Sequence, residues 1–169
     1  IAWGRWQEAL NLTDQLREEK VAPEELAFRR ATALAGLGRL DEGLAVVAPF
    51  GDGRAMPEWL YHDLSAELYL VAGRITDVRS SLERALELAP DNPTVMLDVA
   101  RSDVRYGGDP RRARVLLTLA RKHVLSDMIV PYAVALEGRI LLAEGRSTEA
   151  IPLLEDAHRG FGRTDMQRP

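Results

Sequence analysis

A phrase of seven residues recurs along this chain and constrains its fold more than any other feature. Residues 4–10 read GRWQEAL, residues 38–44 read GRLDEGL and residues 145–151 read GRSTEAI. A glycine begins each copy, and two further glycines at a similar spacing fall between the second and third copies. These five residues, Gly4, Gly38, Gly73, Gly108 and Gly145, are spaced by 34, 35, 35 and 37 residues. A period near 35 residues is typical of stacked pairs of short helices. The sequence therefore predicts an all-α chain built from repeated helical hairpins.

Small residues recur at fixed distances from these glycines. A small residue stands five residues after each glycine, except after Gly73, where the residue is a valine. Another small residue stands seven residues before the glycine. For the repeat at Gly108 this earlier position is counted from Gly107, because the Gly107–Gly108 pair adds one residue there. Small side chains at matching places let the two helices of a hairpin approach closely. The positions are Ala9, Gly43, Val78, Ala113 and Ala150 after the glycine, and Ala31, Ala66, Ala100 and Gly138 before it.

Helix boundaries follow from the glycines, prolines and polar residues. Each glycine is suited to a left-handed helix end, a conformation that costs about 1–2 kcal/mol in a residue with a Cβ. Asp41, Thr76, Asp109 and Ser147 are each placed to cap the returning helix. The expected helices cover about 5–20, 24–37, 41–48, 58–72, 76–89, 94–106, 110–124, 128–144 and 148–160.

The chain resembles the tetratricopeptide repeat (TPR) family. The resemblance rests on residues 85–93, ALELAPDNP, which look like that family's end-of-repeat phrase, and on Glu149 and Ala150 after Gly145. It implies a right-handed αα-superhelix, a TPR-like solenoid, that forms one domain over residues 1–169. A half unit at 1–20 would be followed by four complete hairpins at about 23–55, 57–92, 93–126 and 127–162. The first residues, Ile1 to Trp3, are neither a start methionine nor a charged leader before an apolar segment, so the chain is expected to be a piece of a longer protein.

Proteins similar in this way hold peptides or partner domains on the inner wall, which the first helix of each pair lines. Transferred by distance from the turn glycines, this wall comprises Phe28, Thr32, Asp63, Glu67, Asp98, Ser102, Arg105, Tyr132 and Arg139. Acids, arginines and aromatics together are what a selective groove needs, although any solvent-facing helix is also polar. The lysines and asparagines with which some relatives clamp chaperone tails are absent, since Phe28 and Thr32 stand in the corresponding places. Chaperone-tail binding is therefore not predicted.

Composition and spacing argue against several other classes of function. Basic residues number 22 and acidic residues 26, a net charge of -4 that gives no overall attraction for nucleic acid. There are no cysteines, and the three histidines are far apart, so no metal site or cofactor is predicted. Asp63 and Glu67 share a helix face, but acid–base catalysis needs carboxylates held away from water. The sequence thus favours a protein that is not an enzyme.

Two functional interpretations remain open at this stage. One is a protein–protein interaction scaffold whose groove holds a peptide or partner domain. The other is a regulatory or ligand-sensing segment of a larger protein, such as a bacterial transcription regulator or signalling ATPase. Homodimers could form at either end of the solenoid, through Leu10 and Leu12 or through Leu153 and Phe161. No apolar run approaches the roughly 20 residues that span a bilayer, so no membrane insertion is expected, and the compartment stays open, with the cytoplasm favoured over the periplasm.

Overall fold

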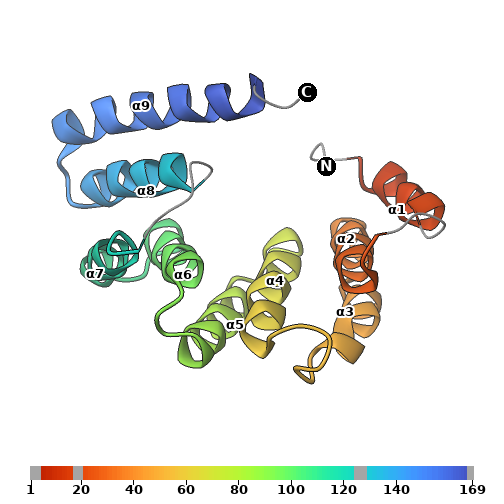
Figure 1. The fold of residues 1–169 in the computed structure, drawn as a ribbon. Helices are drawn as coiled ribbons and strands as arrows, with labels where there is room; N and C mark the ends of the chain where they lie inside the picture. The colour runs from red at the N-terminus through yellow and green to blue at the C-terminus, as the bar shows by residue number, and fades with distance from the viewer. Residues whose placement is uncertain (1–4, 17–20, 124–128, 167–169) are drawn as a thin grey trace. The chain divides into compact units, whose positions relative to one another are not determined.

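A computed structural model describes residues 5–16, 21–123 and 129–166 of the chain, with side chains as far as residue 160. Within these residues the regular structure is helical throughout and contains no strand, which confirms the predicted all-α class (Figure 1). The chain forms two compact units, Ile1–Leu88 and Ala89–Pro169. Each unit is described below by itself. Gly4 and the last residues of the predicted helix 5–20 lie outside the described residues.

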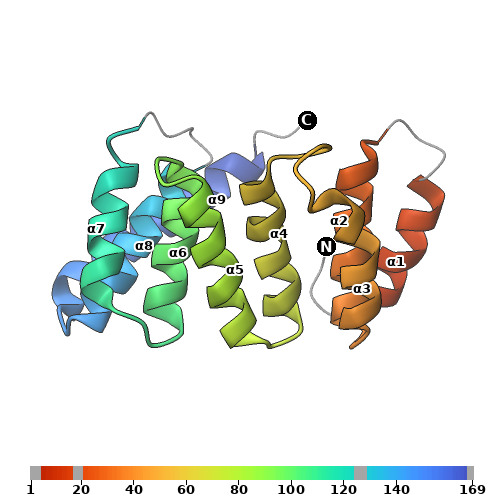
Figure 2. The same cartoon turned by 90° about the horizontal axis from the view of Figure 1, so that it is seen from below.

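The first unit contains two helical hairpins and a helix that precedes them. Helix α2 (Pro23–Gly36) pairs with α3 (Leu40–Val47), which continues into a 3-10 turn, η2 (Ala48–Phe50). Helix α4 (Glu58–Val71) pairs with α5 (Ile75–Leu88) and also packs against α2 and α3. Helix α1 (Trp6–Gln15) packs against α2 (Figure 2). Successive helices are thus packed as neighbouring pairs, as the repeat predicts.

The second unit consists of two further hairpins. Helix α6 (Pro93–Arg105) pairs with α7 (Pro110–Ala120), and α8 (Val130–Ala143) pairs with α9 (Ser147–Met166). Helix α8 packs against both α6 and α7, so the two hairpins form successive layers. Most boundaries agree with the predicted ones to within two residues. Helix α7 ends earlier than predicted, and α9 continues past its predicted end at residue 160.

The hairpin bends are built on glycine. Gly38, Gly73 and Gly145 have φ of 78°, 72° and 78°, which confirms the predicted left-handed helix ends. The amide of the arginine after each glycine donates a hydrogen bond to a carbonyl in the last turn of the preceding helix, over 2.9, 2.8 and 2.9 Å respectively. This is the Schellman motif, which satisfies a carbonyl that the helix end would otherwise leave unpaired.

The bend between α6 and α7 corrects one prediction. The left-handed residue there is Gly107, with φ 73°, and not Gly108. Gly108 follows it, and its amide donates to the Asp103 carbonyl over 2.7 Å. A Cβ on Gly108 would lie 2.7 Å from the Cα of Asp103. Two glycines are therefore needed at this bend, because the first takes the left-handed conformation and the second passes close to the helix end.

The recurring phrase also contains an ion pair that starts the next helix. An arginine directly precedes α1, α3, α5 and α9, and each pairs with an acidic residue three positions later. A carboxylate in the first turn is favoured by the helix dipole. The hydrogen bond from Arg39 lowers the pKa of Glu42. The pairs are Arg5–Glu8, Arg39–Glu42 at 2.7 Å, Arg74–Asp77 at 2.7 Å and Arg146–Glu149 at 2.6 Å.

These ion pairs stand where side-chain caps were predicted. Of the four predicted caps, Asp109 is confirmed, because its carboxylate accepts a hydrogen bond from the Arg111 amide over 2.9 Å. The prediction is wrong for Asp41, Thr76 and Ser147, which already lie inside the first turn of their helices. The Schellman turn leads into the next helix one residue after the arginine, so these helices begin earlier than a capping residue would require.

Small residues line the contact within each hairpin. Apart from Ala9, which is half-buried, all the small positions predicted from the repeat and the equivalent Val78 are buried. In the α2–α3 hairpin, a Cβ on Gly43 would lie 2.9 Å from the Ala31 carbonyl oxygen. In the α8–α9 hairpin, a Cβ on Gly138 would lie 3.3 Å from the Ala150 carbonyl oxygen. The predicted close approach of the two backbones is therefore confirmed in both hairpins.

Candidate functional site

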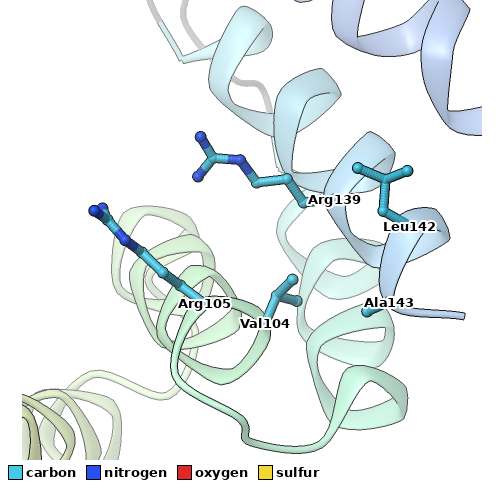
Figure 3. Close-up of a pocket in the computed structure, with 5 residues that line it drawn as sticks. All are labelled: Val104, Arg105, Arg139, Leu142 and Ala143. Atoms are coloured by element: carbon cyan, nitrogen blue, oxygen red, sulfur yellow. The ribbon is translucent and has the colours of Figure 1, made fainter.

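Two of the predicted groove residues meet in one pocket. The pocket lies between α6 and α8, has a volume of about 530 Å³, and is lined by Val104, Arg105, Arg139, Leu142 and Ala143 (Figure 3). This set is called the α6–α8 pocket. Figure 3 shows both arginine side chains extending from their helices towards the same side. The pocket therefore combines two cations with an apolar wall.

Each arginine is presented by the local structure of its helix. Arg105 is the last residue of α6, where the negative end of the helix dipole favours a cation. Its guanidinium lies over the ring of Tyr106, with 5.5 Å from Cζ to the ring centroid, which holds the side chain by a cation–π contact. Arg139 is exposed in the middle of α8, between the buried residues Gly138 and Ile140. Helix packing thus fixes the direction in which Arg139 leaves its helix.

The acidic residues of α6 and α8, and Glu144 directly after α8, are all engaged by other arginines. Asp98 pairs with Arg101 at 2.8 Å and Asp103 with Arg112 at 3.7 Å, while Glu137 pairs with Arg121 at 2.6 Å and Glu144 with Arg114 at 2.7 Å. The hydrogen bonds from Arg114 lower the pKa of Glu144. These four carboxylates therefore already have cationic partners outside the pocket.

The arginines of the α6–α8 pocket are exceptions to this pairing. Leaving Arg79 aside, three of the arginines whose side chains the structure describes form no ion pair with another described residue. They are Arg105, Arg111 and Arg139. Two of the three line the same pocket. The positive charge of this pocket is therefore not neutralised by the described part of the chain.

The remaining groove predictions in the second unit differ in exposure. Tyr132 is 56% exposed and lies two turns before Arg139 on α8, hence on the same helix face. Asp98 is half-buried, and burial raises the pKa of its carboxyl while Arg101 opposes this rise. Ser102 is buried. A buried hydroxyl is not available to a partner, so Ser102 contributes to packing instead of to an exposed wall.

The groove predictions in the first unit are likewise divided. Phe28 is buried in the core formed with Val47, Met56 and Leu68, and its ring meets that of Tyr61 edge-on at 6.1 Å between centroids. Because α4 packs against α2 here, the Phe28 ring is buried, whereas the predicted groove wall requires an exposed side chain. Thr32 is half-buried and donates to the Phe28 carbonyl over 2.8 Å. On α4, Asp63 is half-buried and Glu67 is exposed.

Sequence reasoning missed the apolar part of the pocket. Val104, Leu142 and Ala143 were not predicted, although Leu142 and Ala143 follow Arg139 by three and four residues and so lie one helical turn away. Leu142 is 44% exposed. An exposed leucine one turn from an arginine is the signal that could have identified this wall.

A second pocket lies beside α7, and two of the residues that line it form an ion pair with each other. It has a volume of about 480 Å³ and is lined by Arg111, Arg114, Val115, Thr118, Leu119 and Glu144. There Arg114 binds Glu144 with both of its donors, at 2.9 and 2.7 Å. Arg114 and Glu144 therefore neutralise each other in this pocket, which leaves Arg111 as its one lining charge without an ion pair among the described residues.

No group of three His, Asp or Glu side chains among the described residues is placed to hold a metal ion. None of the described helices combines the length and apolar character needed to cross a membrane. Of the leucines predicted to mediate dimerisation, Leu10 is buried, Leu12 is 52% exposed and Leu153 is half-buried; the side chain of Phe161 lies outside the described ones.

Comparisons of this chain with protein-family models, with curated proteins and with solved structures found no match.

Proposed function

We propose that this chain is a non-enzymatic protein–protein interaction module. In this proposal the hairpins stack as a right-handed αα-superhelix of the tetratricopeptide type, and the first helices of the pairs hold a peptide or a partner domain. Support comes from the four hairpins, which share the left-handed glycine and the buried small residues. Further support comes from α6 and α8, the first helices of successive pairs, which pack against each other.

The observation that carries the proposal is the composition of the α6–α8 pocket. It presents exposed apolar area on Leu142 beside the guanidinium groups of Arg105 and Arg139. Sites that bind peptides combine apolar contact with a few polar groups that fix the orientation of the ligand. Arginine is also among the residues enriched at the energetically important positions of protein interfaces. A peptide or an exposed protein segment is therefore the ligand class that best fits this surface.

The same residues favour binding over catalysis. Arginine stays protonated at all physiological pH values, so neither guanidinium can accept a proton at neutral pH. Val104, Leu142 and Ala143 supply no titratable group. Arg105, Arg139, Leu142 and Ala143 are exposed, and water therefore reaches the groups that line the pocket. Recognition of a ligand by charge and shape requires no more than these residues provide.

The proposal is tested by an unbiased peptide selection followed by mapping of the binding site. The full chain is used to select from a display library of random peptides of about 12 residues, and selected peptides are titrated into isotope-labelled protein. We expect saturable one-to-one binding, with the largest amide shift changes at residues 104–105 and 139–143. Failure to select any saturable binder, or shift changes concentrated away from α6 and α8, would overturn the proposal.

A further inference from the structure

We infer that the α6–α8 pocket selects an acidic peptide segment, in which a carboxylate is bound by Arg105 and Arg139 and a neighbouring apolar side chain contacts Leu142 and Val104. This inference rests on the proposed function, because it names the chemistry of the peptide that the same site binds.

The α6–α8 pocket is positively charged. Two exposed guanidinium groups line one pocket of about 530 Å³ and have no carboxylate partner among the described residues. An anion bound in this pocket is attracted by both guanidinium groups. Guanidinium groups bind carboxylates through charge-assisted hydrogen bonds that are stronger than neutral ones. A carboxylate is therefore the functional group that this pair of arginines favours.

Beside this pocket, the described part of the second unit has no acidic residue without an ion-pair partner. The acidic residues of α6, Asp98 and Asp103, pair with Arg101 and Arg112. Glu144, the acid nearest in sequence to Leu142 and Ala143, is bound by Arg114 and Arg146 at 2.7 and 3.2 Å. Moving Glu144 towards the pocket would break both of these ion pairs. Supply of the carboxylate by a partner leaves all of the internal pairs intact.

Arginine also binds the phosphates of nucleic acids, so the wall of the pocket and the net charge of the chain must distinguish a peptide from a nucleic acid. None of the described residues that line the pocket is aromatic, so they offer no ring on which a base could stack, and those beside the two arginines are aliphatic. The chain as a whole carries a net charge of -4, which repels a polyanion at long range. A single carboxylate next to an apolar side chain gains the local attraction and avoids most of the long-range repulsion. The wall and the net charge therefore both favour an acidic peptide.

The test uses the display selection described above and three variants of the full chain. The peptides selected by the wild type are sequenced, and one fluorescein-labelled binder is titrated against the variants by fluorescence anisotropy. The variants are Arg105→Gln/Arg139→Gln, the charge reversal Arg105→Glu/Arg139→Glu, and Arg111→Gln. Arg111 is the matched control, because it is also exposed and forms no ion pair within the described residues but lies outside this pocket.

We expect the selected peptides to be enriched in Asp or Glu beside an apolar residue. The double glutamine variant should bind the labelled peptide roughly 10-fold more weakly, a loss of about threefold for each exposed charge pair. The charge-reversed variant should select peptides rich in Lys or Arg, and Arg111→Gln should bind as the wild type does. Raising the salt concentration should weaken wild-type binding and leave the binding by the glutamine variant nearly unchanged.

Two different failures can be told apart. If peptides are selected without acidic enrichment, or if the double glutamine variant binds the acidic peptide as tightly as the wild type, the charge inference is overturned while the proposed function stands. If no peptide is selected, the proposed function fails and the inference with it. A labelled oligothymidine of about 12 nucleotides that binds more tightly than the acidic peptide would also overturn the inference. Circular dichroism of each variant checks that it remains folded, as expected for exposed side chains.

Discussion

Replacement of Gly73 by alanine isolates the energetic contribution of one hairpin bend. Gly73 joins α4 to α5 with φ at 72°, and a Cβ added there would have no heavy atom within 4 Å. The substitution therefore creates no clash with neighbouring side chains. Its cost arises only from placing a residue with a Cβ in the left-handed backbone region.

The expected magnitude follows from two opposing terms. The left-handed conformation costs a residue with a Cβ about 1–2 kcal/mol. Alanine also restricts the unfolded chain more than glycine does, which returns about 0.4–1 kcal/mol of stability. The free energy of unfolding of Gly73→Ala should therefore fall by about 1 kcal/mol relative to the wild type.

Urea unfolding followed by tryptophan fluorescence measures this loss in the correct part of the chain. The two tryptophans that the structure describes, Trp6 and Trp59, belong to the same unit as Gly73. The matched control is Gly73→Asn, because asparagine tolerates the left-handed region better than alanine does. We expect the asparagine variant to unfold between alanine and wild type. An alanine variant as stable as the wild type would refute the assignment of the cost to this bend.

Three further predictions concern hairpin packing, capping and burial. Gly43→Ala should destabilise by about 1 kcal/mol in urea unfolding, because the methyl meets the Ala31 backbone and the strain exceeds the gain in helix propensity. Gly138→Ala should destabilise less, because its methyl meets Cγ and Cδ2 of Leu154, both at 2.8 Å, and a side chain can shift more readily than a backbone. Equal losses would argue against this packing account. Asn92→Ala should cost about 1 kcal/mol, since the Asn92 side chain accepts hydrogen bonds from the Thr94 and Val95 amides, and Asn92→Ser should retain most of the stability. Asp98→Asn should raise the melting temperature near pH 7. Burial raises the pKa of Asp98 in the folded state, so its ionised carboxylate destabilises the fold at any pH above that pKa. The advantage of the variant should therefore shrink as the pH falls towards about 4. An advantage that does not depend on pH would exclude this cause.

The fold was predictable to the extent that backbone geometry determines it. A left-handed helix end requires glycine, and a close contact between two helices requires small side chains, so both leave a mark at fixed spacing in the sequence. The bend at Gly107 and Gly108 shows where this reasoning stops. Adjacent glycines satisfy the pattern equally well, and only the position of the Asp103 carbonyl decides which of the two is left-handed.

The candidate site was less predictable, because its character depends on interactions among side chains distant in sequence. The position on the helix predicted a place on the groove wall for Phe28 and for Arg139 alike. Phe28 is instead buried in the core and contacts Tyr61 of another hairpin, whereas Arg139 is exposed.

Pairing of charges across helices decides which arginines of the site are available. Arg114 and Arg139 are the same residue type on neighbouring helices, but Arg114 meets Glu144 from the end of α8 and Arg139 meets no described carboxylate. Such pairing joins residues 9 to 30 positions apart in this unit, a range of separations that periodicity does not encode. The arginines left without a described carboxylate after this pairing therefore cannot be identified from their repeat positions alone.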